Sequence, residues 1–343
     1  MLVLGVESSC DEMAAAVVRD GREILSSCVH GQADVHGPYG GVVPELASRD
    51  HTRAVSRVVA NALSEAGLAP EQLDGVAVTA GPGLVGSLLV GLSFGKALAY
   101  RMGLPVVGVH HLEGHLAATA LAAPDLEPPY VGLVISGGHT ALYRIESGRP
   151  PRLLGQTRDD AVGEAFDKVA RLLGLPYPGG PAVSAAARAG SEVALKFPRP
   201  LLDRAGFDFS YSGLKTAVAL EVERRGELSE EERADIAASF EAAAVEPLVV
   251  KARRALEAEG VGALAVVGGV AANRRLREEM GRAASAMGFR AVFPPSDLCT
   301  DNAAMIAAAG SALLARGEAH GLDLNSFSRV PVGSAPWSSG GAA

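Results

Sequence analysis

The sequence has few of the features that mark secreted and membrane proteins. Its 343 residues include only three cysteines, which are far apart and form no Cys-x-x-Cys pair: Cys10, Cys28 and Cys299. That spacing argues against a disulfide framework and against a zinc knuckle. No apolar run is long and uninterrupted enough to cross a bilayer, and residues 1–5 lead into an expected strand without the charged leader of a signal peptide. We therefore expect a soluble, cytoplasmic protein with no membrane partner.

The sequence also lacks the basic excess typical of proteins that bind nucleic acid unaided. It has 31 basic and 39 acidic residues, a formal net charge of -8. If RNA is the substrate, a local basic patch or a partner protein must supply the contacts with phosphate. No Walker A loop is present, and no G-x-G-x-x-G motif opens the first strand unit. A P-loop fold or a classical dinucleotide-binding fold is therefore not expected.

One pattern of strands and turns occurs twice along the chain. Three strands joined by tight turns are predicted at 2–8, 13–18 and 24–29, and again at 130–135, 139–145 and 152–156. A strand, a glycine turn and a helix then follow in each half, at 74–101 and at 263–287. This repetition indicates an α/β fold of two related lobes, and the cleft between such lobes is where ligands usually bind.

A long helix is predicted over residues 44–66, since the segment opens on proline, precedes glycine and has apolar residues at helical spacing. Arg49, Arg53 and Arg57 form a stripe along another face of this helix. The stripe fits a face exposed to solvent, and it also fits a contact with a partner protein or with RNA. The sequence leaves these alternatives open.

Two histidines at a strand-to-helix junction are the best candidates for metal ligands. His111 and His115 follow an expected strand at 106–109, and their spacing puts them on one face of a helix. That spacing suits two imidazole ligands to one ion, and the position at a junction favours this over two ordinary histidines. The neighbouring His110 is expected to point away.

A zinc metalloprotease also uses two histidines of one helix, but its motif places a glutamate directly after the first histidine. Here Leu112 follows His111, and Glu113 lies about 200° around the helix from His111. Glu113 cannot easily reach a water molecule on the metal from there. The spacing therefore argues against a peptidase.

Two histidines alone make a weak site, so a carboxylate ligand is expected as well. Asp301 is the best candidate, because it follows an expected strand at 291–293 and a proline turn and then starts a helix. The spacing fits equally well a helix N-cap formed by Thr300 or Asp301. Near the first turn, Asp11 is left open between a base, a metal ligand and a turn residue, whereas Glu12 is expected to be an ordinary turn residue.

Four glycine-rich turns beside strand ends or helix starts offer backbone N–H groups to a phosphate. They lie at residues 81–83, 136–138, 179–180 and 268–269. Asp167 is expected on a helix whose apolar face holds Val169, Leu172 and Leu173, and its simplest role there is a surface ion pair.

Longer segments follow one another in an order that identifies a family. They are 3–12, 39–51 (YGGVVPELASRDH), 79–86, 110–115 (HHLEGH), 136–140 (SGGHT), 163–168 (GEAFDK), 177–181 (YPGGP), 209–216 (FSYSGLKT), 268–274 (GGVAANR) and 299–305 (CTDNAAM). Together they resemble the tRNA N6-adenosine threonylcarbamoyltransferase family of bacterial type, over residues 1–332. Members of that family were formerly labelled O-sialoglycoprotein endopeptidases, a label that the position of Glu113 argues against.

The resemblance implies a duplicated actin-like or sugar-kinase-like fold of the ribonuclease H-like type, with two lobes and a central cleft. The lobes are expected at residues 1–127 and 128–332. The terminal helix from about residue 300 is allowed to pack back on the first lobe. The small, Gly/Ser-rich segment 333–343 is expected to be a disordered tail.

The resemblance also implies the activity and the site. The threonylcarbamoyl group would move from threonylcarbamoyl-AMP to N6 of the adenosine 3′ of the anticodon, in tRNAs reading codons that begin with A, with release of AMP. By motif match the metal ligands would be His111, His115 and Asp301. Asp11, in the first turn, is the candidate catalytic residue. The acyl-adenylate site would comprise Val134, Ile135, Ser136, Gly137, Gly138, Asp167, Gly180 and Asn273. One divalent ion, iron or zinc, is expected, with threonylcarbamoyl-AMP or an adenine nucleotide in the cleft.

The partners implied by the resemblance are tRNA, a smaller degenerate paralogue and a small ATPase. Some archaeal and eukaryotic relatives carry a tyrosine that contributes to the metal where this chain has Val134. Since valine cannot ligate, the metal should keep an open position for water or substrate. An acyl phosphate is already activated, so such an enzyme must mainly hold the acyl-adenylate and the amine in attack geometry.

Two other functions fit the same fold. An ATP-dependent small-molecule kinase would need a carboxylate aimed at a hydroxyl group and would not need a metal at His111 and His115. A non-catalytic nucleotide-binding scaffold would allow normal tRNA modification after both histidines are replaced.

Overall fold

The structure is a computed structural model that describes residues 1–334 and 336–337, and it divides into two compact units. Unit 1 comprises Met1–Leu126 together with the described residues from Asp297 onward, and unit 2 is Glu127–Ser296. The segment from Asp297 onward thus belongs with the first unit rather than with residues 128–296.

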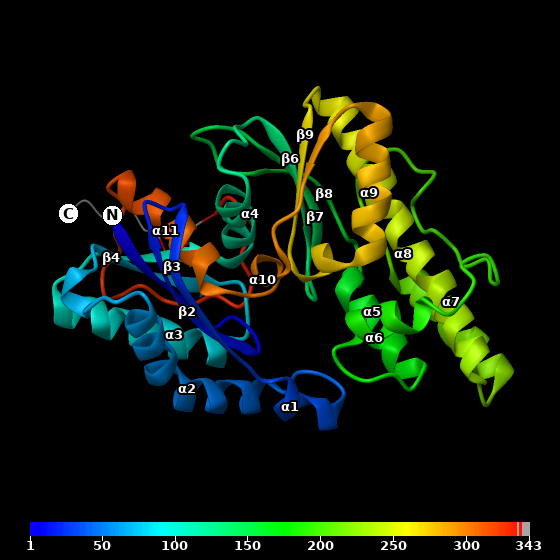
Figure 1. The fold of residues 1–343 in the computed structure, drawn as a ribbon, viewed down its shortest axis with the longest axis horizontal. Coiled ribbons are helices and arrows are strands. Elements are labelled where there is room, and N and C mark those ends of the chain that lie inside the picture. The colour runs from blue at the N-terminus through cyan, green and yellow to red at the C-terminus, as the bar shows by residue number, and fades with distance from the viewer. Residues whose placement is uncertain (335, 338–343) are drawn as a thin grey trace. The chain divides into compact units, whose positions relative to one another are not determined.

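Unit 1 is built on a five-stranded sheet whose order is β3-β2-β1-β4-β5. Strands β2, β3 and β4 of this sheet are labelled in Figure 1. The strands are β1 (Leu2–Glu7), β2 (Glu12–Arg19), β3 (Glu23–Gly31), β4 (Gly75–Gly81) and β5 (Val106–His110). The first three pair antiparallel, while β4 pairs parallel with β1 and β5 pairs parallel with β4. Strand β1 is apolar on both faces because both faces of the sheet are covered by helices.

The helices of unit 1 form two layers around this sheet. They are α1 (Ala33–His36), α2 (Pro44–Glu65), α3 (Val85–Met102), α4 (His111–Ala122), α10 (Ser296–Cys299) and α11 (Ala303–Ala315), with single turns η1 (Gly37–Tyr39) and η2 (Pro70–Gln72). Leu4 of β1 belongs to a core with α2 and α3, whereas Val3 belongs to a second core with α4 and α11. Alternate residues of one strand thus serve opposite layers, which places α4 and α11 together on one face.

Unit 2 repeats the architecture with a sheet of order β10-β9-β6-β7-β8. Its strands are β6 (Tyr130–Ile135), β7 (Thr140–Ile145), β8 (Arg152–Gln156), β9 (Ala263–Val267) and β10 (Arg290–Val292). Here too an antiparallel three-stranded meander is extended by two parallel strands. The duplicated α/β fold that the sequence predicted is confirmed.

The helices of unit 2 include the longest in the described chain. They are α5 (Val162–Leu172), α6 (Gly179–Ala187), α7 (Ser212–Arg225), α8 (Glu230–Glu259) and α9 (Arg274–Met287), with a turn η3 (Gly269–Ala272). Helix α8 begins at a reciprocal capping box between Ser229 and Glu232. Two expectations are corrected: Phe166 rather than Leu172 lies in the core, and the helix expected from residue 271 begins at Arg274, after the η3 turn.

Part of the segment expected to be a disordered tail packs on unit 1. Trp337 is buried and donates its Nε1–H to the carbonyl of Gly108 at 3.1 Å. The N–H of Gly333 donates to the carboxylate of Glu113 at 2.9 Å. The expectation of disorder is therefore wrong for these residues, while 335 and 338–343 lie outside the described residues. Among the described residues no helix is long and apolar enough to span a membrane.

Candidate metal centre

The junction between β5 and α4 places the two predicted histidines. Strand β5 ends at His110, and His111 is the first residue of α4. His110 turns away from the pair, because its Nδ1 accepts the N–H of Leu112 at 3.2 Å and its Nε2 lies 3.1 Å from the carbonyl of Val330. His115, one turn into α4, faces His111 edge-on with 4.8 Å between the ring centroids.

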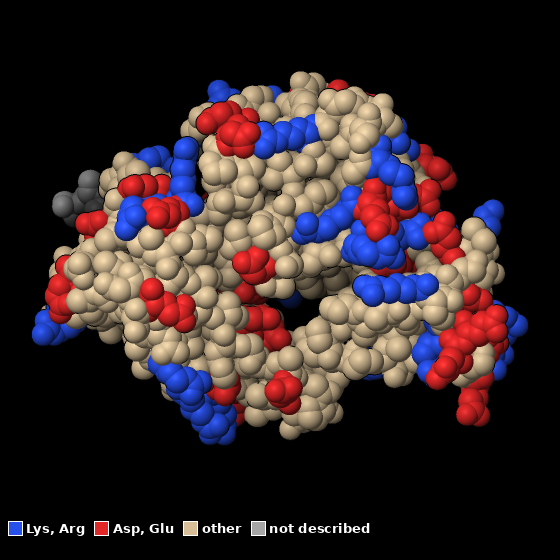
Figure 2. Space-filling view, in the orientation of Figure 1, with Lys and Arg blue, Asp and Glu red and all other residues tan. Residues whose placement is uncertain are grey.

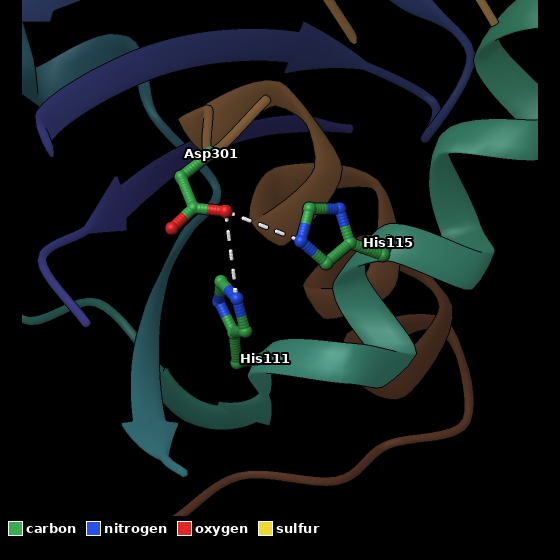
Figure 3. Close-up of side chains that lie close together, drawn as sticks. All are labelled: His111, His115 and Asp301. Atoms are coloured by element: carbon green, nitrogen blue, oxygen red, sulfur yellow. Dashed lines mark ion pairs between the residues drawn. The ribbon is translucent and has the colours of Figure 1, made fainter. Parts of the chain in front are cut away.

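Asp301 joins the two histidines from a segment 186 residues beyond His115. One oxygen of its carboxylate, Oδ1, lies 3.2 Å from Nε2 of His115 and 3.5 Å from Nε2 of His111 (Figure 3). One ligand atom from each of the three side chains lies within 4.8 Å of the others. Contact of α4 with α11 on one face of the unit 1 sheet brings these segments together.

The alternative role of Asp301 as a helix cap is wrong. Asn302 caps α11, since its Oδ1 accepts the N–H of Met305 at 3.0 Å. Its Nδ2 donates to the carbonyl of Thr300 at 2.8 Å, which closes the turn before the helix. The cap therefore holds the preceding turn in place, and the Asp301 carboxylate points toward the histidines.

The chemistry of the three side chains fits a divalent metal ion. Both ring nitrogens of His115 are buried, and neither makes a hydrogen bond. Nε2 faces the Asp301 carboxylate at 3.2 Å, and a cation between them would satisfy both the buried nitrogen and the carboxylate. Two imidazoles and one carboxylate form a donor set that suits zinc or iron and leaves a coordination position open.

A buried carboxylate that the sequence analysis missed stands behind His111. Oε2 of Glu7 and Oγ of Ser9 each lie 3.2 Å from Nδ1 of His111. The other Glu7 oxygen, Oε1, accepts the N–H of Ser9 at 2.5 Å. A carboxylate behind a ligating imidazole fixes the ring orientation and the tautomer. The available signal was a charged residue at the end of the otherwise apolar strand β1.

The site is electrostatically acidic. Burial by itself would lower the pKa of His111, but Asp301 and Glu7 together raise it to about 9. Burial would raise the pKa of Glu7, yet the charge and hydrogen bond of His111 hold it below its usual value. Burial, Asp301 and Asp11 raise the pKa of Glu12 to about 9, and Glu12 is the first residue of β2 rather than the turn residue that was expected. A divalent cation would relieve this crowding of carboxylates.

The residues predicted to bind an acyl-adenylate all lie in unit 2, and their segments pack together. The side chains of Val134 and Ile135 are buried in β6, which leaves their backbone for any contact with a ligand. Gly268 has a φ of +94°, and an added Cβ would lie 2.5 Å from the carbonyl oxygen of Ile135. An added Cβ on Gly163 would lie 2.5 Å from the carbonyl oxygen of Ser136. Only glycine permits these approaches.

Asp167 ties two of these segments together. Its Oδ1 accepts the N–H of Gly179 at 2.8 Å, at the start of α6, a contact that the sequence did not predict. By contrast, open space surrounds the Cβ positions of Gly137, Gly138 and Gly180. Their backbone is therefore accessible to a close-approaching group such as a phosphate.

Asn273 has more internal partners than predicted. Its Oδ1 caps α9 by accepting the N–H of Leu276 at 2.9 Å. Its Nδ2 donates to Oε1 of Glu241 at 2.8 Å and to Oγ of Ser184 at 3.0 Å. Both amide hydrogens are thus used within unit 2. Glu241 and Ser184 were not predicted from the sequence, because their partner lies on a different element.

Comparison with known proteins identifies close relatives over nearly the whole chain. The profile of the family described as tRNA N6-adenosine threonylcarbamoyltransferase matches residues 23–308. A protein of that name from Syntrophotalea carbinolica is 51% identical over 338 residues, covering 98% of both chains. One from Geobacter sp. is 53% identical, covering 97% of both chains. One from Anaeromyxobacter dehalogenans is 55% identical, covering 94% of this chain and 97% of its own.

Solved structures of low sequence identity share the fold. HypF of T. kodakarensis superposes with a TM-score of 0.62 at 17% identity, covering 92% of this chain and 48% of its own. Component A of the (R)-2-hydroxyglutaryl-CoA dehydratase of Acidaminococcus fermentans superposes with a TM-score of 0.53 at 15% identity, covering 91% and 99%. These neighbours extend the duplicated two-sheet architecture to chains with little sequence in common.

Proposed function

The chain belongs to the tRNA N6-adenosine threonylcarbamoyltransferase family, and we propose that His111, His115 and Asp301 are the metal ligands of this transferase. The enzyme forms N6-threonylcarbamoyladenosine in tRNA. The metal assignment depends on one observation: a ligand atom from each of the three residues lies within 4.8 Å of the others. Both ring nitrogens of His115 are buried there without a hydrogen bond. The comparisons give no support to a small-molecule kinase or to a non-catalytic scaffold.

The residues around the donors prepare them for a metal. Glu7 and Ser9 hold Nδ1 of His111, so that its Nε2 is directed toward Asp301. The cap formed by Asn302 fixes the turn that carries Asp301. When bound, a divalent cation of this kind supplies Lewis acidity toward an oxygen of the threonylcarbamoyl group.

The transfer itself needs no nucleophilic side chain. The N6 amine attacks the carbonyl carbon of the threonylcarbamoyl group, a C–N bond forms and the bond to the phosphate oxygen breaks. AMP leaves with the electron pair, and the amine gives up one proton. Asp11, in the turn between β1 and β2, is the proposed acceptor of that proton, and its carboxyl lies close enough to Glu12 to raise the pKa of Glu12.

The acyl-adenylate is assigned to unit 2. The backbone of Val134 to Gly138 and of Gly180 would contact the phosphate and the acyl group, because Gly137, Gly138 and Gly180 leave open space there. Asp167 holds the start of α6 beside this backbone. The Oδ1 of Asn273 uses one of its two acceptor sites for the helix cap, so the second could accept a hydrogen bond from a ribose hydroxyl.

Other proteins are proposed to help bind tRNA. Unit 1 contains 9 of the 31 basic residues and 17 of the 39 acidic residues, so the acidic excess of the whole chain lies in this unit. Phosphate contacts supply much of RNA affinity, and an acidic unit supplies few. The proposed partners are a smaller degenerate paralogue and a small ATPase.

The test is a reconstituted reaction with tRNA, threonylcarbamoyl-AMP and the partner proteins, followed by nucleoside analysis and elemental analysis of the enzyme. His115→Ala and Asp301→Ala should each lose bound metal and reduce the modified nucleoside by at least about 100-fold. His30→Ala is the matched control, because His30 pairs with Asp50 at 2.7 Å and belongs to no ligand group. Full metal content in Asp301→Ala would remove the aspartate from the site.

A further inference from the structure

A chain of buried polar side chains runs through unit 1 toward the metal centre. Gln32, His36 and His51 have exposed fractions of 1%, 0% and 0%. Nε2 of His36 lies 3.0 Å from Oε1 of Gln32, Nε2 of Gln32 lies 2.9 Å from Nδ1 of His51, and Nε2 of His51 lies 2.9 Å from the carbonyl oxygen of Cys10. Buried polar groups of this kind are retained only where their partners are all supplied.

The backbone groups at the two ends of this row of polar side chains set the direction of every hydrogen bond within it. At one end the backbone N–H of Val43 can only donate to Nδ1 of His36, at 3.3 Å. At the other end the carbonyl of Cys10 can only accept from Nε2 of His51. Each histidine therefore carries a proton on Nε2, and Nδ1 of His36 is an acceptor.

The amide of Gln32 satisfies this direction in one orientation. Its Oε1 accepts from His36, while its Nε2 donates to His51 and also to the carbonyl of Ala47 at 3.3 Å. If the amide were flipped, its N–H group would face the N–H donor of His36. Its oxygen would then face two other acceptors, Nδ1 of His51 and the carbonyl of Ala47. Burial also lowers the pKa of His51, in agreement with a neutral ring.

The turn whose Cys10 carbonyl accepts the last of these hydrogen bonds also carries Ser9, which contacts the proposed metal ligand His111. Cys10 follows Ser9, whose Oγ lies 3.2 Å from Nδ1 of His111. The carbonyl of Ser9 accepts the N–H of Leu84 at 2.8 Å, so the turn is held from one side by α3. His51 of α2 holds the next carbonyl along the turn.

We infer that His51 is a positioning residue, which fixes the turn from Ser9 to Asp11 through the carbonyl of Cys10 and so fixes Ser9 against His111. Gln32 and His36 support it by keeping its ring in one tautomer. The inference rests on the proposed function, because the position of His111 matters only if His111 serves the site. No part of it requires His51 to touch the substrate.

Two substitutions separate this role from mere packing. The amide nitrogen of Gln reaches the position of Nε2, so His51→Gln keeps a donor for the Cys10 carbonyl. The shorter amide of Asn reaches the position of Nδ1, so His51→Asn keeps a partner for Gln32 and loses the bond to Cys10. His30→Gln and His30→Asn are matched controls on strand β3, since His30 pairs with Asp50 and is not one of the hydrogen-bonded side chains Gln32, His36 and His51.

The reconstituted reaction is run at saturating substrate, with metal affinity measured by titration of Co²⁺ into the metal-free protein. We expect His51→Asn to lower kcat by about tenfold and to weaken Co²⁺ binding, with little change in KM, and His51→Gln to retain most of both. Gln32→Met, which removes the support but not the donor, should fall between them. Unfolding curves identify any variant that fails to fold.

The outcomes are distinct. Equal losses in His51→Gln and His51→Asn, or wild-type values in His51→Asn or Gln32→Met, would overturn the positioning role. If His51→Asn does not fold, the comparison of His51→Gln with Gln32→Met still decides it, because only the latter should lose activity. Failure of the proposed function is separate, since the wild-type protein would then bind no Co²⁺ at His111 or form no modified nucleoside.

Discussion

The two units share one topology and differ in chemistry at equivalent turns. Strands β1 and β2 of unit 1 are joined by Ser8 to Asp11, which leads into Glu12, whereas β6 and β7 of unit 2 are joined by Ser136 to His139 with two glycines. The first turn adds carboxylates that interact with Asp301 and Glu7, and the second offers open backbone. The sheet order fixes where a turn lies, and its side chains decide whether it serves a cation or an anion.

The charges differ in the same sense. Unit 1 has 9 basic and 17 acidic residues, so the other 22 of the 31 basic and 22 of the 39 acidic residues leave unit 2 neutral. Figure 2 shows basic and acidic side chains interleaved over α8 and α9, where Arg274 pairs with Glu278 and Arg275 with Glu279. The proposed cation in unit 1 and the proposed anionic adenylate in unit 2 match this difference.

The largest effect that would sharpen the comparison is expected at Glu7, which has no counterpart among the residues of the second turn. Glu7→Gln keeps the shape but removes the charge behind His111, so metal affinity should fall by about 10–100-fold. Metal titration of the purified variant measures this. Thr79→Val is the control, because it removes another hydrogen bond to Glu7 and leaves the carboxylate in place. Wild-type affinity in Glu7→Gln would show that the carboxylate does not tune the site.

A smaller effect is expected in unit 2, where substitutions should weaken binding of the adenylate without changing the metal content. Asp167→Ala releases the N–H of Gly179, and Asn273→Ala removes the α9 cap, at a cost of about 1 kcal/mol in stability for the cap. Both variants should weaken binding of a non-hydrolysable adenylate analogue by about tenfold and leave the metal content unchanged. Calorimetry measures the affinity. Wild-type affinity in both variants, or loss of metal in either, would break the division of roles between the units.

Glu12 tests whether the acidic crowding of unit 1 is real. Its folded-state pKa of about 9 lies above its usual 4.5, so its contribution to stability is full below pH 4.5 and is lost as the pH rises toward 9. The comparison uses protein freed of metal by a chelator. At pH 8 the free energy of unfolding of Glu12→Gln should exceed that of the wild type by about 2 kcal/mol, and near pH 4 the two should not differ. Urea unfolding at both pH values measures this. A difference that is equal at both pH values would contradict the assignment.

The smallest effect on stability is expected for the arginine stripe of α2, which is exposed in unit 1 and visible as a basic cluster in Figure 2. Arg49 pairs with Glu45 across exposed side chains, and such pairs contribute about 0–1 kcal/mol. Charge reversal at Arg49, Arg53 and Arg57 should thus leave the unfolding midpoint nearly unchanged. If the stripe contacts the proposed smaller paralogue, the same change should reduce association with it. Lost tRNA binding with intact association would assign the stripe to RNA instead, and no change in either would leave it as a solvated face.

The strands and the candidate ligands were accessible from the sequence for definite reasons. Short apolar runs between glycine turns predict strands locally, and the four-residue spacing of His111 and His115 is a property of one helix. The longest helix, α8, was not predicted, because it is buried on nearly all sides from residue 234 to 249 and therefore has no clear polar stripe. Position after a strand and a proline turn made Asp301 the best candidate carboxylate, and the family resemblance favoured it as a ligand although local spacing fitted a helix cap equally well.

The sequence by itself determined the duplicated architecture, the histidine pair and the absence of a protease geometry, since each depends on residues near one another in the chain. Only the tertiary structure decided that Asn302 rather than Asp301 caps α11, that Glu7 stands behind His111 and that His51 holds the turn at Cys10. These contacts join residues 41 to 104 positions apart, or depend on which of two neighbouring side chains turns inward. Such choices follow from the packing of helices on a sheet, and no local period in the sequence encodes them.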